Sequence, residues 1–180
     1  MNKTSKTKVM AMTAMFATLI TVATAFIKVP HAFGYTHPGD SMVYLSACVL
    51  PTPYGIIASA IGGGLADLIA GYPQWILPTV IIKALNAVPF VLCRYILSKR
   101  NKDNRIINIP TVMMIVPTTA ITVFGYFVAN YLLYGIGGAL ADLAMWWIQP
   151  SIAALVFIPV GLGLDALSFK SKMLPRLLRW

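Results

Sequence analysis

The chain of 180 residues is 58% hydrophobic and 11% charged, with a mean hydropathy of +0.77, whereas about a quarter of the residues in soluble domains are charged. This composition excludes a soluble globular domain and predicts an all-α integral membrane protein, folded as one transmembrane domain over residues 1–180. The net charge of +9 does not indicate a nucleic-acid partner, because the basic residues cluster at the ends of apolar segments, as membrane topology requires.

The first predicted span, residues 9–29, follows a basic N-terminus, which places that terminus in the cytoplasm. Small residues recur four positions apart on this span and would let another helix approach closely in lipid. Two interpretations stay open: packing inside the bundle, or a docking face for a partner subunit. The predicted docking residues are Thr13, Ala14, Ala17 and Thr21.

Residues 28–40 are too polar and too rich in turn-forming residues to cross a bilayer, so we expect them to form an outer loop. The loop contains both histidines of the chain, His31 and His37, together with Tyr35 and Asp40. Asp40 could cap the next helix. The spacing of the two histidines matches no specific metal-site pattern, and no metal is predicted.

Five further spans are predicted at residues 39–50, 54–71, 75–97, 109–134 and 146–167. The second is short for a bilayer, since ten helical residues cover about 15 Å. The hydrophilic connector between residues 98 and 109 is expected in the cytoplasm. A bundle of six transmembrane helices with both termini in the cytoplasm then places twelve of the fourteen basic residues on one side, in agreement with the positive-inside rule. These twelve are Lys3, Lys6, Lys8, Arg94, Lys99, Arg100, Lys102, Arg105, Lys170, Lys172, Arg176 and Arg179.

One motif occurs twice, at the outer ends of two predicted spans. Residues 62–68 read Gly-Gly-Gly-Leu-Ala-Asp-Leu, and residues 137–143 read Gly-Gly-Ala-Leu-Ala-Asp-Leu. Gln74 and Gln149 follow the two copies at the same offset. The repeat predicts two turns of similar design that form two walls of one site, although shared packing needs could also explain it.

Lys83 is the one cation well inside a predicted span, and an intramembrane charge indicates function by default. Thr79 and Asn86 share its helical face, while Tyr126 and Asn130 share a face of the fifth span. We expect Lys83 to pair with Asp67 or Asp142, because an unpaired buried charge is costly. These polar faces either hold the bundle together through interhelical hydrogen bonds or line an outward-facing ligand pocket.

A flat heteroaromatic ligand would suit the aromatic side chains near the outer surface, with the indole of Trp146 or Trp147 against its face and amide groups at its polar edge. The outer loop is the one external segment long enough to close over it as a lid. The predicted substrate-binding residues are Tyr35, His37, Asp40, Lys83, Asn86, Tyr126, Asn130, Trp146 and Gln149.

Missing motifs narrow the functional classes. The sequence has no ATP-binding loop of the Gly-x-x-x-x-Gly-Lys-[Ser/Thr] type and no glutamate, which leaves an intramembrane enzyme with few catalytic groups. We therefore predict a protein that is not an enzyme and needs no cofactor. A stand-alone secondary carrier or channel is the alternative, but such carriers normally use carboxylates near the midplane. An enzyme using His31, His37 and Asp40 is a third possibility.

Several segments together resemble a known family. They are the basic N-terminus with its small-residue helix, the loop sequence Gly-Tyr-Thr-His-Pro-Gly-Asp-Ser at 34–41, Leu-Ala-Asp at 65–67 and Pro-Thr-Val-Ile-Ile-Lys at 78–83. Nearly the whole chain is similar to the substrate-binding S components of energy-coupling factor (ECF) vitamin transporters, nearest the branch grouped with hydroxymethylpyrimidine or pyridoxine carriers. The Ala-x-x-x-Ala signature of the family's first helix is only approximated, by Thr13 with Ala17 and Ala14 with Thr18.

The resemblance implies a substrate-specificity subunit of an ATP-driven importer in the bacterial plasma membrane. Such a subunit is a six-helix bundle that captures a vitamin or its precursor outside the cell. It joins a transmembrane coupling subunit and two ATP-binding subunits, and it reorients in the membrane to deliver its ligand. The ligand that the resemblance implies is small and heteroaromatic, related to hydroxymethylpyrimidine or pyridoxine.

Overall fold

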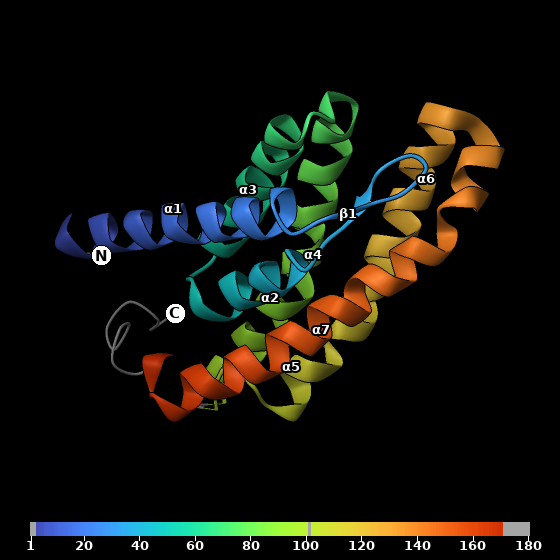
Figure 1. The fold of residues 1–180 in the computed structure, drawn as a ribbon. Coiled ribbons are helices and arrows are strands. Elements are labelled where there is room, and N and C mark those ends of the chain that lie inside the picture. The colour runs from blue at the N-terminus through green and yellow to red at the C-terminus, as the bar shows by residue number, and fades with distance from the viewer. Residues whose placement is uncertain (1–2, 101, 171–180) are drawn as a thin grey trace.

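The computed structural model describes residues 3–100 and 102–170, which form a bundle of helices (Figure 1). The longer helices are α1 (Lys3–Ala25), α2 (Asp40–Val49), α3 (Tyr54–Ala70), α4 (Ile76–Lys99), α6 (Ile115–Ala141) and α7 (Leu143–Ala166). Shorter elements are the strands β1 (Val29–Pro30) and β2 (Tyr35–Thr36), the 3-10 turn η1 (Pro73–Trp75) and the helix α5 (Ile109–Met113). The basic residues Lys172, Arg176 and Arg179 lie outside the described part of the chain.

Within the described residues, four helical segments are long and apolar enough to cross a membrane: Lys6–Ala25, Pro73–Lys99, Ile109–Ala141 and Met145–Ala166. Helices α2 and α3 are apolar but shorter. The protein is therefore an all-α membrane protein. The count of six spans and the side on which the termini lie stay predictions.

Two predicted boundaries were wrong. The first helix ends at Ala25 rather than near residue 29, because Val29 and Pro30 pair with Tyr35 and Thr36 as an antiparallel hairpin. The turn predicted at the second copy of the repeated motif, residues 137–143, is mostly helical. Gly135 alone leaves helical geometry, at φ 73° and ψ −174°, after which α6 resumes as far as Ala141; the positive φ is accessible to glycine at little cost.

Recognisable local signals set other helix ends. α3 stops at Gly71, whose φ of 83° forms the left-handed cap common after helices. α5 begins with a capping box, in which the Asn108 side chain accepts from the Thr111 N–H and the Thr111 hydroxyl accepts from the Asn108 N–H. Pro110 occupies the first turn of α5, where it sacrifices no helical hydrogen bond.

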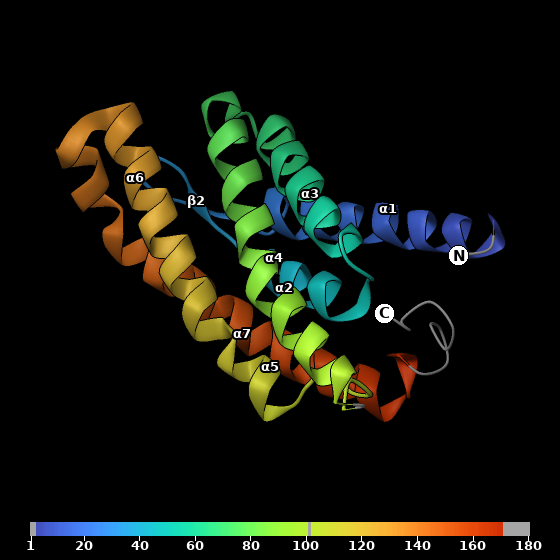
Figure 2. The ribbon, with the colours of Figure 1, turned by 180° about the vertical axis from the view of Figure 1, so that it is seen from behind.

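The glycines of α3 bring three helices into close contact. A Cβ atom on Gly62 would lie 2.7 Å from the Ala17 carbonyl oxygen on α1, and one on Gly63 would lie 2.7 Å from the Lys83 Cγ on α4. Any side chain would therefore push α1 or α4 away. Figures 1 and 2 show α3 beside both helices from opposite directions.

An aromatic cluster forms the centre of the main core between α2, α4 and α7. The Tyr44 ring stacks on Phe90 with centroids 4.7 Å apart, and Phe157 meets both rings edge-on. All three side chains are fully buried. This core joins the short α2 to the two long helices that carry the polar residues described below.

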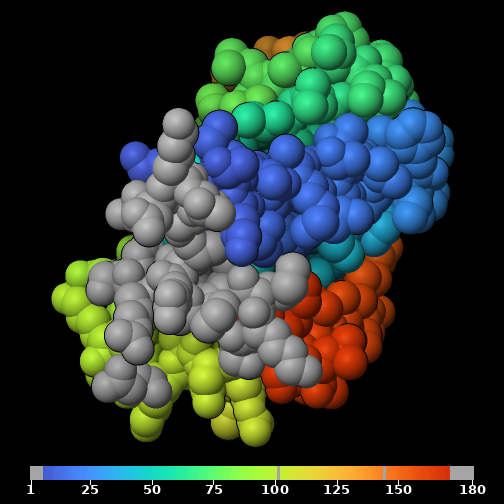
Figure 3. All heavy atoms as spheres, turned by 90° about the vertical axis from the view of Figure 1, so that its left-hand side faces the viewer, coloured from blue at the N-terminus to red at the C-terminus, as the bar shows by residue number. Residues whose placement is uncertain are grey.

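The β1–β2 hairpin lies at one end of the bundle, and the start of α1 and the end of α7 lie at the other. In Figure 1 the first turn of α1 and the last turn of α7 lie on the left, while the hairpin extends to the right towards the junction of α6 and α7. Figure 3, which views the left-hand side, shows α1 at the surface between the green of α3 and α4 and the red of α7. One end of α1 thus remains accessible beside two other helices.

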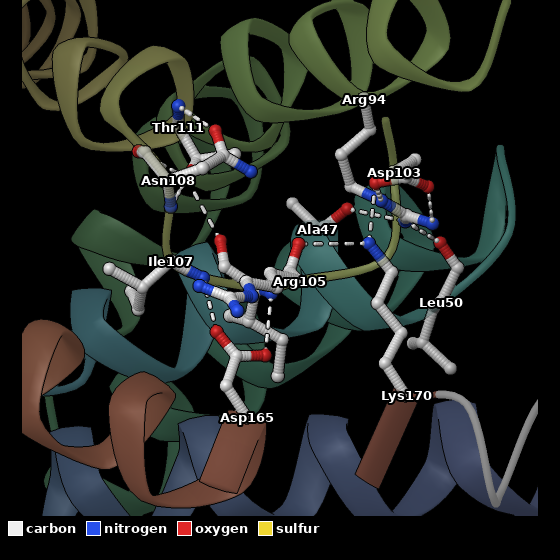
Figure 4. A network of polar contacts seen from close by, with 11 residues as sticks. Ala47, Leu50, Arg94, Asp103, Arg105, Ile107, Asn108, Thr111, Asp165 and Lys170 are labelled. Atoms are coloured by element: carbon white, nitrogen blue, oxygen red, sulfur yellow. Dashed lines mark hydrogen bonds and ion pairs between the residues drawn. The ribbon is translucent and has the colours of Figure 1, made fainter. Parts of the chain in front are cut away.

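A buried ionic network ties together the end opposite the hairpin (Figure 4). Arg94 on α4 donates to the carbonyl oxygens of Ala47 and Leu50 at 3.0 and 2.8 Å, and it pairs with Asp103 at 3.1 Å. Lys170 also pairs with Asp103, at 2.5 Å. Burial and the nearby Arg94 charge lower the pKa of Lys170. This network caps the C-terminal end of α2, whose last carbonyls have no partner within the helix.

Asp165 anchors the connector at the same end of the molecule. Its two carboxylate oxygens accept from the N–H groups of Ile106 and Ile107 at 2.7 and 2.8 Å (Figure 4). The connector between α4 and α5 is therefore held to the last turns of α7 through backbone groups.

Candidate ligand-binding site

A small cavity of about 30 Å³ lies beneath the β1–β2 hairpin. It has room for about two water molecules, since one needs roughly 10–15 Å³ by this measure. The hairpin and its flanking loop, α3, η1, α4, α6 and α7 all contribute to its walls. The lining residues are His31, Gly34, Tyr35, His37, Asp67, Trp75, Thr79, Tyr126, Trp146 and Gln149.

A fully buried ion pair lies next to the cavity. The Lys83 ammonium is 2.5 Å from Asp40 Oδ1, and both side chains are 0% exposed. Gln149 donates from Nε2 to the other carboxylate oxygen of Asp40 at 2.7 Å. One end of the Gln149 amide is thereby held in place while the side chain lines the cavity.

Two expectations about these charges were wrong. Lys83 pairs with Asp40 rather than with Asp67 or Asp142, and the Asp40 side chain does not cap α2, which has no side-chain cap at its N-terminus. The physical reason is the packing of α2 against α4. This packing brings the first residue of α2 to the polar face of α4, where a carboxylate compensates a charge that lipid would not solvate.

Aromatic rings form the apolar walls of the cavity. Trp75, Tyr126 and Trp146 are buried and belong to one hydrophobic cluster. The Tyr126 ring lies 5.7 Å from that of Trp75 and 6.4 Å from that of Trp146, with interplanar angles of 57° and 24°. The Lys83 ammonium lies 5.6 Å from the Tyr126 ring centroid, within cation–π range. Trp147, the other indole considered for ligand stacking, is 57% exposed.

The two copies of the repeated motif hold the hairpin from opposite sides. The Tyr35 hydroxyl donates to Asp67 Oδ1 at 2.6 Å, and His31 Nδ1 lies 2.9 Å from Asp142 Oδ2. A third contact runs from Trp75 Nε1 to the carbonyl oxygen of Phe33 at 2.9 Å. The repeat thus places one carboxylate on each side of the loop that covers the cavity.

His37 is a neutral hydrogen-bonding group. Burial, followed by the positive charge of Lys83, lowers its pKa to about 3. Its Nδ1 accepts from the Gly39 N–H at 3.1 Å, so the proton of the neutral ring resides on Nε2, which can donate. Like His31 and Asp40, His37 has a polar partner of its own.

Four predicted site residues do not line the cavity: Asp40 and Lys83, which form the ion pair beside it, and Asn86 and Asn130. The Asn86 amide donates to the Thr122 hydroxyl at 2.9 Å, which links α4 to α6. The Asn130 amide nitrogen lies 3.4 Å from both the Gly138 carbonyl oxygen and Asp142 Oδ2. Both of these partners follow the break in α6 at Gly135. A neighbouring helix thus holds the Asn86 amide, as in other membrane bundles, whereas the Asn130 amide is held by the end of its own helix α6.

Sequence reasoning omitted five residues that line the cavity: His31, Gly34, Asp67, Trp75 and Thr79. Signals for three of them existed. Asp67 belongs to the repeated motif, Thr79 lies one turn before Lys83 on the same helical face, and Trp75 belongs to the aromatic set at the outer surface. For His31 the sequence offered only its place in the outer loop.

The predicted docking residues divide into two groups. Thr13, Ala17 and Thr21 are buried, and the Thr21 hydroxyl bonds across to the Gly62 carbonyl oxygen of α3 at 3.0 Å. Ala14 is exposed. All four residues line an open apolar groove of about 620 Å³ between α1 and α3, so internal packing and an accessible surface coexist on this face.

Comparison with known proteins agrees with this architecture. Residues 4–166 match the family model described as "ECF-type riboflavin transporter, S component". A protein of Pyrococcus woesei, described as "Uncharacterized protein in gap 3'region", is 34% identical over 125 residues, which cover 68% of this chain and 78% of that protein. S components are substrate-binding subunits that work with membrane coupling and ATPase subunits. The chain therefore belongs to the family of ECF-type riboflavin transporter S components and is a multi-pass protein of the cell membrane.

Proposed function

We propose that this protein binds a small, flat heteroaromatic vitamin or vitamin precursor on the outer face of the membrane and delivers it inward as the specificity subunit of an ECF importer. In this proposal the protein has six spans and both termini in the cytoplasm. A transmembrane coupling subunit and two ATP-binding subunits supply the energy, since the chain has no ATP-binding loop of its own.

One observation carries the proposal: an aromatic-walled cavity beneath a hairpin, with a buried ion pair beside it. Buried charges in lipid are costly and mark ligand sites by default. Trp75, Tyr126 and Trp146 offer ring faces to a flat ligand, while Gln149 and His37 offer hydrogen bonds at its edge. Lys83 and Asp40 serve the site by fixing Gln149, and Tyr35 closes it from the hairpin.

The size of the cavity favours an outer loop that opens. At about 30 Å³ it is far below the 300–1,000 Å³ of ordinary ligand pockets, so a vitamin enters after the hairpin has lifted. The contacts of Tyr35 with Asp67, His31 with Asp142 and Trp75 with Phe33 are those that opening would break. Each lies at the outer end under the proposed topology, which is the side from which a ligand arrives.

The chemistry of the walls favours a compact ring over a large tricyclic one. Hydroxymethylpyrimidine and pyridoxine each present one ring and a few polar edge groups, whereas riboflavin, the vitamin in the family's description, carries three fused rings and a ribityl chain. We rank the single-ring compounds first, and riboflavin is the comparison ligand.

The experiment is binding and uptake by the purified protein. Titration calorimetry with hydroxymethylpyrimidine, pyridoxine and riboflavin is expected to give the tightest binding for a single-ring compound. Uptake into proteoliposomes is expected only when the coupling and ATPase subunits are present with ATP. Ligand accumulation by the chain alone would identify a stand-alone carrier instead, and absence of binding by all three would refute the proposed ligand class.

The proposed topology has its own test. In a background without Cys48 and Cys93, single cysteines at the exposed positions 73 and 102 are expected to react with an impermeant maleimide from outside and from inside, respectively. A cysteine at position 36 is predicted to lie outside too, but Thr36 is buried under the hairpin and its labelling should await opening. Labelling of position 102 from outside would overturn the six-span arrangement.

A further inference from the structure

Only one oxygen of the Asp67 carboxylate has a hydrogen-bond partner among the described residues, although Asp67 is only 3% exposed and lines the cavity. The Tyr35 hydroxyl occupies Oδ1 at 2.6 Å, whereas no described residue donates a hydrogen bond to Oδ2. Buried polar atoms are nearly always paired, and an unpaired one costs about 1–3 kcal/mol. Such an atom facing a binding cavity calls for a partner from outside the protein.

The neighbours of Asp67 do not supply that partner. Thr79 and the cations Lys83 and Lys28 all act on the Asp67 charge. The Thr79 hydroxyl, however, lies 3.4 Å from the Tyr126 hydroxyl, and Lys83 is bound to Asp40. Lys28 lies over the rings of Tyr35 and Tyr72 and donates to the Ala70 carbonyl oxygen at 3.4 Å.

We propose that Asp67 Oδ2 accepts a hydrogen bond from an N–H group of the ligand and thereby selects a heteroaromatic ring that carries an amino group or a protonated ring nitrogen. The inference rests on the proposed function and adds to it the single oxygen atom that selects the ligand. Edges that present only carbonyl or ether oxygens or unprotonated ring nitrogens are rejected, because two acceptors would face each other without a proton.

His37 supplies the complementary half of the recognition. Tyr35 contacts both groups: its hydroxyl donates to Asp67, and its ring centroid lies 5.5 Å from that of His37. His37 Nε2–H donates, since Nδ1 is occupied by Gly39. A ligand edge with one donor and one acceptor, such as a ring nitrogen beside an exocyclic amino group, satisfies both. An edge that lacks the donor leaves Asp67 unpaired, which is how polar sites discriminate most strongly.

The repeated motif provides a matched control. Asp142 occupies the same motif position as Asp67 and also contacts the hairpin, but it does not line the cavity. Asp142→Asn removes the same charge as Asp67→Asn at the same end of the bundle. A general effect of charge or of lid closure would appear in both variants, whereas recognition of the ligand donor would appear only in Asp67→Asn.

The test compares two probes that differ at one position. They are 4-amino-5-hydroxymethyl-2-methylpyrimidine and 5-hydroxymethyl-2-methylpyrimidine, which lacks the amino group and carries no N–H, titrated calorimetrically into wild type and both variants. Wild type is expected to prefer the amino compound by tenfold or more. Asp67→Asn, which places an amide near the ligand, should lower that preference at least tenfold, and Asp142→Asn should retain it.

The outcomes separate this inference from the proposed function. Binding with an unchanged preference in Asp67→Asn, or a wild type that prefers the compound without the amino group, overturns the role of Asp67 and leaves the transporter proposal standing. Failure of wild type to bind either probe, pyridoxine or riboflavin refutes both. If Asp67→Asn does not fold, Asp67→Ser serves in its place, because it lacks the second oxygen and is expected to lower the preference too.

Discussion

Two buried polar networks lie at opposite ends of the bundle, and they differ in how completely they are satisfied. At the end opposite the hairpin, Arg94 and Lys170 share Asp103, and Arg94 also binds two helix-terminal carbonyl oxygens. Beneath the hairpin, Lys83 and Asp40 neutralise each other while Asp67 keeps an unpaired oxygen beside a cavity.

The difference separates a structural network from a binding one. The hydrogen bonds that Figure 4 draws from Arg94 are accepted by backbone carbonyl oxygens or by a carboxylate of the same chain. Among the described residues, the Arg94 network therefore does not call for a ligand. Beneath the hairpin the protein leaves hydrogen-bonding capacity unused, at a cost in stability. We interpret this unused capacity as the part of the site that a ligand completes, and the following predictions test that distinction.

The largest expected effect is on stability at the Arg94 network. Arg94→Met leaves the carbonyl oxygens of Ala47 and Leu50 without their donor and Asp103 with Lys170 alone. Breaking a buried pair costs about 3–5 kcal/mol, so thermal unfolding in detergent should shift strongly downward. Ligand affinity, measured on the folded fraction, is expected to stay within threefold of wild type, and a selective loss of affinity would contradict a purely structural role.

Removal of the Lys83–Asp40 ion pair is expected to lower ligand affinity rather than stability. Asp40→Asn with Lys83→Met removes both charges together, which is often nearly neutral for stability. Gln149 then loses the carboxylate that positions it, and ligand affinity should fall tenfold or more, equivalent to about 1.4 kcal/mol. Lys83→Ala alone should weaken binding at least as much. Unchanged calorimetric affinity in both variants would show that this pair serves the bundle only.

Two neighbouring alanines on α1 distinguish docking from packing. Ala14 is exposed in the groove, whereas Ala17 packs against Gly62 of α3. Ala14→Phe should block uptake with the partner subunits while leaving ligand affinity and thermal stability unchanged. Ala17→Phe should in addition destabilise the fold by about 1–3 kcal/mol through overpacking. Normal uptake by Ala14→Phe would remove this face from the proposed docking surface.

A further prediction is a pH dependence of stability from His37. Because its folded pKa, about 3, lies below the ordinary value near 6.5, the unfolded chain binds a proton that the folded chain does not. Its contribution is present above pH 6.5 and is lost as pH falls towards 3, by up to about 1.4 kcal/mol per pH unit. Melting temperatures of wild type and His37→Asn should therefore converge between pH 6.5 and 4.5, and parallel curves would contradict the shift.

Asn130 illustrates why helical periodicity did not identify the whole site. It shares a helical face with Tyr126, and periodicity alone gives both the same exposure to a pocket. The break at Gly135 folds the end of α6 so that Gly138 and Asp142 approach Asn130. We therefore expect Asn130→Ala to weaken binding less than Lys83→Ala does, because it acts through the Asp142 side of the hairpin.

The amino-acid sequence by itself determined the properties that depend on composition and on local pattern. Hydropathy predicted an all-α membrane protein. Turn-forming residues marked the ends of the predicted spans, and the observed helices at 40–49, 54–70 and 76–99 agree with those spans within two residues. The loop before Asp40 and the position of Lys83 inside a long apolar helix followed from the same reasoning. Each of these properties follows from the solvation of short segments in lipid or water, which requires no knowledge of distant residues.

Tertiary structure alone decided which charges meet. Asp40 and Lys83 are 43 positions apart, and Gln149 is 109 positions beyond Asp40. The sequence suggested Asp67 or Asp142 as the partner of Lys83, but the packing of α2 against α4 brought a third acid, Asp40 at the start of α2, to it instead. Likewise the repeated motif predicted two similar carboxylates, Asp67 and Asp142. The path of the hairpin between them determined that Asp67 lines the cavity and Asp142 does not.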